Sequence, residues 1–155
     1  MQEVVIENPI INSPFEEPQL HFRFDENGLT NEIVEKRRIS HYFIPIAKPK
    51  KKSKQLELEY GGHWTSDRIE ENEFINYIRE KVGIWRKGGY RGAVGITAIT
   101  RRLLEHWKNP DRERRLFFCQ LEALETIIYI TEVAKRSGDT YIENMLQKYK
   151  EEAGS

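Results

Sequence analysis

Residues 109–134 make up the longest periodic apolar segment in the chain, and no other stretch restricts the fold as strongly. Asn109 can cap the start of a helix there, and Pro110 suits its first turn because the backbone N–H at that position has no helical partner. The pattern predicts one long helix over residues 110–136. Its apolar side would carry Leu116, Phe117, Leu121, Ala123, Leu124, Ile127, Ile128, Ile130 and Ala134. Three glutamates would lie on the opposite, solvated side: Glu122, Glu125 and Glu132.

Gln120 falls inside the apolar side of this predicted helix, away from the glutamates. A buried primary amide without hydrogen-bond partners costs on the order of 1–3 kcal/mol, so we expect some group to bind it. Two interpretations remain open. The amide can join the helix to neighbouring backbone, or it can bind a planar ligand whose edge offers one donor and one acceptor, as adenine does.

The N-terminal part of the chain has the pattern of an extended arm followed by a hairpin. Prolines interrupt residues 1–19 and oppose both helix and central strand, which predicts an extended arm. Residues 20–25 then alternate between apolar and polar side chains. Asn27-Gly28 follows, a pair that favours the turn between antiparallel strands. We therefore expect a β-hairpin whose second strand covers residues 29–35.

Beyond residue 63 the apolar spacing becomes helical. A helix is expected to begin at the capping-box pair Asp67 and Glu70 and to end at Gly88-Gly89. A second helix is expected from the cap Thr97 to Asn109-Pro110. The long helix comes third, and Gly138-Asp139 separates it from a last, strongly charged helix.

These elements predict two regions. Residues 1–62 would hold the arm and a hairpin or small antiparallel sheet, with a further strand at residues 42–46. Residues 63–155 would be mainly helical, with about four helices. The predicted fold class is α+β.

The charge of the chain gives no overall attraction to nucleic acid. It carries 25 basic and 25 acidic residues, so any contact with DNA must come from local clusters. The lysine run at residues 48–54 can contact phosphates, or it can be a solvated loop, since no aromatic residue interleaves with its lysines to stack on bases. The candidate DNA-binding residues are Lys50, Lys51, Lys52, Arg37 and Arg38.

The sequence predicts neither a metal site nor a catalytic residue. The four histidines lie far apart and lack the spacing that places two ligands on one helix face. Cys119 is the single cysteine, and no base stands beside it to activate the thiol. No apolar run approaches the ~18 residues that a bilayer crossing needs, and the start does not resemble a signal peptide. We therefore expect a cytoplasmic protein with no membrane partner.

Several strings of the sequence resemble a known family of enzymes. Residues 116–123 (LFFCQLEA), which include Gln120, resemble the adenine-recognising glutamine segment that opens the motor of superfamily-two helicases and translocases. Other strings resemble the N-terminal region of the restriction (Res) subunits of type III restriction enzymes, which are ATP-dependent DNA translocases that carry a nuclease. These strings are NPIINSPFEEP (8–18), RFD (23–25), TNEIVE (30–35) and RRLLEHW (101–107).

The resemblance implies that Gln120 binds the adenine edge and that Phe117 or Phe118 forms the apolar wall beside the base. It also implies DNA and a modification (methyltransferase) subunit as partners, and ATP and Mg as cofactors of the full-length enzyme. The chain contains no G-x-x-x-x-G-K-[S/T] loop and no acidic metal box, so it lacks the groups that phosphoryl transfer requires. We expect the chain by itself to be inactive, as the N-terminal fragment of a longer enzyme whose ATPase core is missing.

Two other functions remain open for such a chain. It can be a non-catalytic interaction protein whose exposed apolar surfaces bind a partner. It can also be a small DNA-binding module that works through the lysine run and the two arginines.

Overall fold

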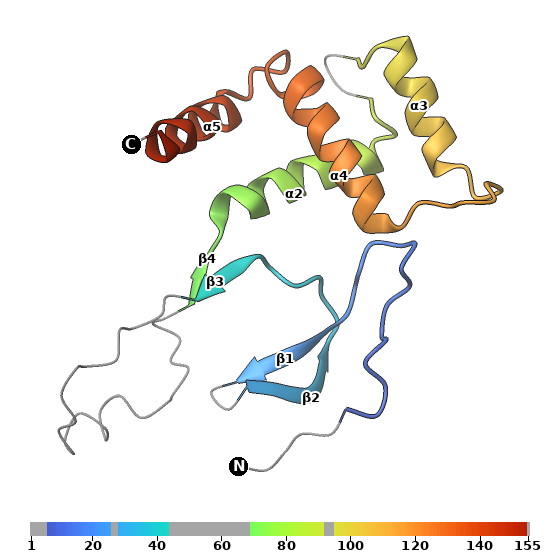
Figure 1. Ribbon diagram of the computed structural model, residues 1–155, viewed down its shortest axis with the longest axis vertical. Helices are drawn as coiled ribbons and strands as arrows, with labels where there is room; N and C mark the ends of the chain where they lie inside the picture. Colours follow the sequence, from blue (N-terminus) through green and yellow to red (C-terminus); the bar gives the residue numbers. More distant parts are fainter. Residues whose placement is uncertain (1–5, 26–27, 44–68, 92–94, 155) are drawn as a thin grey trace. The chain divides into compact units, whose positions relative to one another are not determined.

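Over its described residues, the structure is an α+β fold with helices in the C-terminal half and two small antiparallel sheets, and the sequence predicts this class (Figure 1). The chain splits into two compact units, a strand-containing unit and a helical unit. The strand-containing unit comprises Met1–Ser13 and Glu17–Asn72, and the helical unit comprises Pro14–Glu16 and Glu73–Ser155. The computed structural model describes residues 6–25, 28–43, 69–91 and 95–154.

The predicted hairpin is confirmed in the strand-containing unit. Strand β1 (His21–Asp25) pairs antiparallel with strand β2 (Gly28–Val34), with an irregularity in register between Phe22 and Phe24. Gly28 has a φ of 114°, which residues with a Cβ rarely adopt, so a glycine suits the start of the second strand. The turn chemistry of the sequence was therefore sufficient to predict the pairing of these strands.

A second pair of short strands corrects the predicted start of the first helix. Strand β3 (His41–Phe43) pairs antiparallel with strand β4 (Ile69–Glu71), and the Tyr42 hydroxyl donates to the Glu70 carboxylate at 2.6 Å. The strand predicted at residues 42–46 is confirmed at its start, and residues 44–46 lie outside the described residues. The helix predicted from Asp67 is wrong over β4, because pairing with β3 satisfies backbone groups that the capping pattern assigned to a helix.

The described part of the N-terminal arm, residues 6–20, contains neither helix nor strand, as its prolines predict. Asn12 ties the arm to the start of the hairpin. Its Oδ1 accepts from the backbone N–H groups of Gln19 and Leu20 at 3.0 Å each, and its Nδ2 donates to the Leu20 carbonyl at 2.9 Å. A single amide side chain therefore satisfies three backbone groups of a segment that has no ladder of its own.

The described residues of the helical unit form four helices, one of which changes its winding. They are α2 (Glu73–Lys87), α3 (Ala98–Lys108), α4 (Phe118–Ile128), which continues as the π-helix η2 (Tyr129–Ala134), and α5 (Thr140–Ala153). Three of the predicted helix boundaries are confirmed. Thr97 caps α3 by accepting from the Thr100 N–H at 3.1 Å, Gly89 follows α2 with a φ of 67°, and Gly138 precedes α5 with a φ of 78°.

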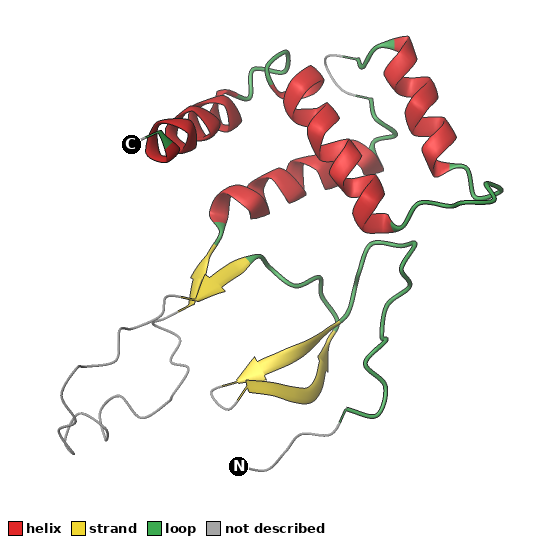
Figure 2. Ribbon diagram, in the orientation of Figure 1, coloured by secondary structure: helices red, strands yellow, loops and turns green. Residues whose placement is uncertain are grey.

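The single helix predicted over residues 110–136 is wrong at its N-terminal end. Residues 109–117 form a connection without helix, and α4 begins at Phe118 (Figure 2). Asn109 is the C-cap of α3 and its Oδ1 accepts from the Asp111 N–H at 2.9 Å, so it closes the preceding helix instead of opening the next. The three arginines of this connection would also repel the positive end of a helix dipole, which explains the later start.

The core of the helical unit lies among α2, α3, η2 and α5. Val82, Leu104 and Ile142 are almost completely buried, and the Trp85 ring meets the Tyr129 ring edge-on with centroids 5.7 Å apart. The other buried members of the cluster are Phe74, Ile78, Tyr90, Val133 and Ala134. Every helix in the described residues falls short of the length and apolarity that a bilayer crossing requires.

Two glycine substitutions should change stability in opposite directions. We expect Gly138→Ala to lower the free energy of unfolding by about 1 kcal/mol, because its φ of 78° is strained for any residue with a Cβ. Gly83 lies inside α2, and a Cβ added there meets no atom within 4 Å. Gly83→Ala should therefore raise the free energy of unfolding by up to about 1 kcal/mol. Urea unfolding of both variants tests this, and a change of the same sign in both would contradict it.

Candidate functional site

The start of α4 presents Gln120 to solvent. The Gln120 side chain is exposed, and its Oε1 accepts from the Phe117 backbone N–H at 2.9 Å. The expectation that this amide lies among apolar side chains is therefore wrong, since α4 begins only two residues earlier and its first turn is open to water. The amide oxygen therefore binds neighbouring backbone, which is the first of the two interpretations of Gln120. Its Nε2 has no hydrogen-bond partner among the described residues.

Aromatic and cationic side chains lie at the same end of α4. Phe117 is 47% exposed, and its ring lies 5.4 Å from the ring of Phe15, centroid to centroid. The Arg115 guanidinium lies 4.5 Å from the centroid of the Phe15 ring. Pro14 holds this part of the arm in place because its carbonyl accepts from the Phe118 N–H at 2.8 Å. We call Phe15, Arg115, Phe117 and Gln120 the α4-start cluster.

Phe118 has a different role from Phe117. It is only 8% exposed, and the guanidinium of Arg86 lies 4.8 Å from the centroid of its ring. Phe118 is therefore a packing residue, whereas about half of the Phe117 side chain is exposed. Phe15 was not foreseen as a site residue, because it is far from Gln120 in the sequence and only the folded arm brings it to α4.

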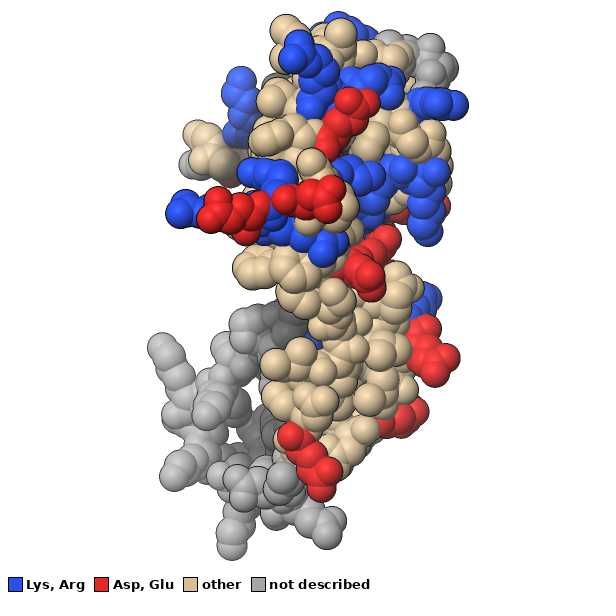
Figure 3. All heavy atoms as spheres, turned by 90° about the vertical axis from the view of Figure 1, so that its right-hand side faces the viewer, with Lys and Arg blue, Asp and Glu red and all other residues tan. Residues whose placement is uncertain are grey.

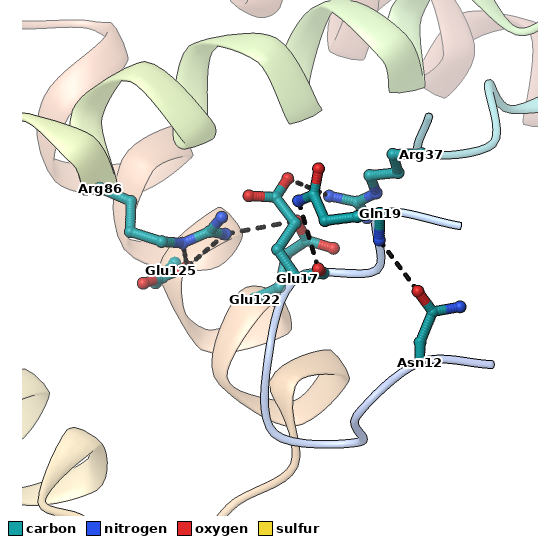
Figure 4. Close-up of polar contacts among 7 residues, drawn as sticks. All are labelled: Asn12, Glu17, Gln19, Arg37, Arg86, Glu122 and Glu125. Atoms are coloured by element: carbon teal, nitrogen blue, oxygen red, sulfur yellow. Dashed lines mark hydrogen bonds and ion pairs between the residues drawn. The ribbon is translucent and has the colours of Figure 1, made fainter. Parts of the chain in front are cut away.

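Glu125 corrects the prediction that the glutamates of α4 lie on a solvated side. Its side chain is completely buried, and its Oε2 accepts from Nε of Arg86 at 2.7 Å, with Nη2 of the same guanidinium at 2.6 Å (Figure 4). The Tyr90 hydroxyl donates to its Oε1. Arg86 also contacts Glu122, with Nη2 and Oε1 3.3 Å apart. A carboxylate removed from water is stable only with such partners, and both oxygens of Glu125 have one.

The pKa values of Tyr90 and Arg86, the two partners of Glu125, are both raised. Burial, together with the hydrogen bond to the Glu125 carboxylate, raises the pKa of the Tyr90 hydroxyl well above its ordinary value. Burial alone would lower the pKa of Arg86, but the hydrogen bond and the charge of Glu125 outweigh it and leave the pKa above its ordinary value. The arginine therefore remains charged and the tyrosine remains a donor, which keeps the carboxylate satisfied.

The third glutamate is also engaged with other helices. The Glu132 carboxylate accepts from the Thr100 hydroxyl at 2.6 Å and from the Thr97 N–H at 3.3 Å. Part of the apolar side of this helix, which was predicted to be buried, is instead exposed to solvent: Ile127 is 61% exposed, and Ala123 is also exposed. The helix is thus rotated relative to its simplest amphipathic interpretation, because Arg86 of α2, Tyr90 after α2 and two threonines at the start of α3 are partners of the glutamates.

The structure does not bring the predicted DNA-binding lysines and arginines together among its described residues. Lys50, Lys51 and Lys52 lie outside the described residues. Arg37 is paired with Glu17 at 3.0 Å, an interaction that a phosphate would have to replace (Figure 4). Arg38 lies over the Phe24 ring, 4.4 Å from its centroid. Within the residues that are described, no three His, Cys, Asp or Glu side chains gather as a metal site would require.

We expect the two glutamates that contact Arg86 to differ in their effect on stability. Glu125→Gln should lower the free energy of unfolding by about 3 kcal/mol, because it leaves the buried guanidinium without its main counter-charge. Glu122→Gln should cost about 1 kcal/mol or less, because its contact is longer and its side chain keeps some access to water. Urea unfolding measures both losses, and equal losses would show that Glu125 has no special role.

The raised pKa of Tyr90 predicts an alkaline limit to stability. A hydroxyl whose pKa is raised on folding contributes fully below its ordinary pKa of 10.0, and its contribution is lost as the pH rises above that value. The free energy of unfolding should therefore fall above about pH 10, and it should fall less steeply in Tyr90→Phe. Parallel slopes in the two proteins would rule out this contribution.

Comparisons of the chain with protein-family models, with curated proteins and with solved structures give no match.

Proposed function

We propose that this chain is the N-terminal part of an ATP-dependent DNA translocase of the type III restriction (Res) kind, and that the start of α4 recognises adenine. The observation that supports this proposal best is the exposed Gln120 amide, which binds the backbone N–H of Phe117, together with the exposed ring of Phe117. The local likeness of residues 116–123 to the adenine-recognising glutamine segment concerns the same side chains.

The chemistry of the α4-start cluster suits an adenine base. The adenine edge offers an amine donor and a ring-nitrogen acceptor side by side. The Gln120 amide complements it, since Nε2 can donate and Oε1 can accept a second hydrogen bond beside that of Phe117. Stacking of a base on an aromatic ring contributes on the order of 1–3 kcal/mol. The half-exposed Phe117 offers such a ring, and Phe15 packs against it from another segment of the chain.

The cluster supplies only part of a nucleotide site. Arg115 is the cation next to the aromatic rings, but the chain has no phosphate-binding loop and no acidic metal box. ATP phosphates and Mg would be held by an ATPase core in the full-length enzyme, where they supply the hydrolysis that moves DNA. The part played by the residues of this chain is to bind the base and to orient it toward that core.

The buried ion pair beneath the site would hold it in place. Arg86 joins Glu125 of α4 and packs on Phe118, so α2 fixes the first turn of α4. A groove between α2 and α4, lined by Ile75, Cys119 and Ile127 among others, opens on the same helix. Such an apolar groove suits packing against an ATPase core, and it is also the feature that would favour the alternative of an interaction protein.

The test is a comparison of two glutamine variants in the chain extended with its downstream ATPase core. Gln120→Ala should raise the ATP concentration for half-maximal DNA-stimulated hydrolysis about ten-fold, which corresponds to the loss of about 1.4 kcal/mol of base recognition. It should also reduce the preference for ATP over GTP. Gln147→Ala is the matched control, because Gln147 lies on α5 and bonds only to Glu151 in the same helix.

An unchanged nucleotide requirement in Gln120→Ala would remove Gln120 from the nucleotide site. Hydrolysis without any dependence on DNA would contradict the translocase itself. Phe117→Ala provides a second measurement, since loss of the stacking surface should raise the same half-maximal concentration while Phe118→Leu acts mainly on stability.

A further inference from the structure

Cationic side chains concentrate on α3 and on the connection that follows it. Residues 98–117 contain six lysines and arginines against three acidic residues, although the whole chain is balanced. Figure 3 faces the side of the molecule on which α3 and this connection lie in Figure 1, and lysine and arginine side chains gather there over the helical unit. We call this set the basic face: Arg101, Arg102, Lys108, Arg112, Arg114 and Arg115.

The arginines of the basic face are mostly not used by the fold. In the described part of the chain, the side chains of Arg101, Arg102 and Arg114 form no ion pair or hydrogen bond, and Arg102 and Arg114 are exposed. This contrasts with Arg86 and Arg37, which are paired with glutamates. An arginine needed for the fold has a partner here, so the unpaired ones are available to an external anion.

The arrangement suits a row of phosphates better than a single anion. Arg101 and Lys108 lie two turns apart on one side of α3, and Arg102 lies about 100° further round the helix. Arg114 and Arg115 follow in the connection to α4. Guanidinium groups bind phosphate oxygens through two parallel hydrogen bonds, which makes arginine the suitable residue for a phosphodiester backbone.

We propose that the basic face binds the phosphate backbone of double-stranded DNA. The inference deepens the proposed function and rests on it for the choice of DNA as the polyanion. It places the DNA contact on α3 and the following connection instead of on the lysine run at residues 48–54 or on Arg37 and Arg38. The contact is independent of sequence, because it uses phosphates and not base edges.

The experiment measures binding of a fluorescent duplex of about 20 base pairs by anisotropy, from about 50 to 200 mM salt. The basic-face variant combines Arg101→Gln, Arg102→Gln and Arg114→Gln. Arg112 is left unchanged because its Nη1 is buried, and Arg115 because it packs on Phe15. The charge-matched control combines three exposed cations of the same unit: Lys135→Gln, Arg136→Gln and Lys150→Gln.

The basic-face variant should bind the duplex at least ten-fold more weakly at low salt. Its slope of log affinity against log salt should be smaller by about 2 to 3, because each lost phosphate contact removes about 0.9. The control should keep both affinity and slope within two-fold. Equal losses in the two variants, or absence of duplex binding at low salt, would overturn the proposal.

Two further measurements distinguish DNA binding by the basic face from binding by the lysine run and from general polyanion binding. A variant with Lys50, Lys51 and Lys52 changed to Gln should retain the affinity, and a loss confined to it would move the contact to the lysine run and overturn the proposal. A heparin fragment of equal charge that binds as tightly, with the same dependence on the basic face, would show a general polyanion site instead. Gln120→Ala should leave duplex affinity unchanged, so failure of adenine recognition and failure of DNA binding appear in different assays.

Discussion

The buried contact between Glu125 and Arg86 is the interaction on which the helical unit depends. A carboxylate with no access to water is stable only when its charge and both of its oxygens are satisfied. Arg86 of α2 supplies the charge, and Tyr90 supplies a second donor just beyond the end of the same helix. This requirement aligns α4 against α2 more strictly than apolar contact would, since hydrogen bonds are directional and apolar contact is not.

The same contact explains which side chains of α4 are exposed. Because Glu122, Glu125 and Glu132 face other helices, Ile127 and Ala123 remain open. The first turn of α4 projects beyond the ion pair, so Phe117 and Gln120 are exposed while the neighbouring Phe118 is held under Arg86. The exposed residues at the start of α4 are thus adjacent in the chain to a buried residue that packs against α2.

Local chemistry was sufficient for much of the fold. The Asn27-Gly28 turn predicted the hairpin, Thr97 predicted the start of α3, and Gly138 predicted the break before α5. Predictions failed where a distant partner competed with a local pattern. β4 pairs with β3 instead of opening a helix, and Asn109 ends α3 instead of starting α4. For the candidate site, the sequence identified Gln120 and Phe117, whereas Phe15 and Arg115 could be grouped with them only after folding.

By itself, the sequence determined the α+β class, the hairpin, the start of α3 and the glycine-marked ends of the helices, because spacing, glycines and capping residues act within a few positions of the chain. Only the tertiary structure decided which side of α4 is buried. Periodicity places apolar residues inward by default, but a glutamate can be buried more deeply than an isoleucine when an arginine and a tyrosine from another segment are positioned to meet it. That match depends on the packing of α2 against α4, which no local pattern of residues contains.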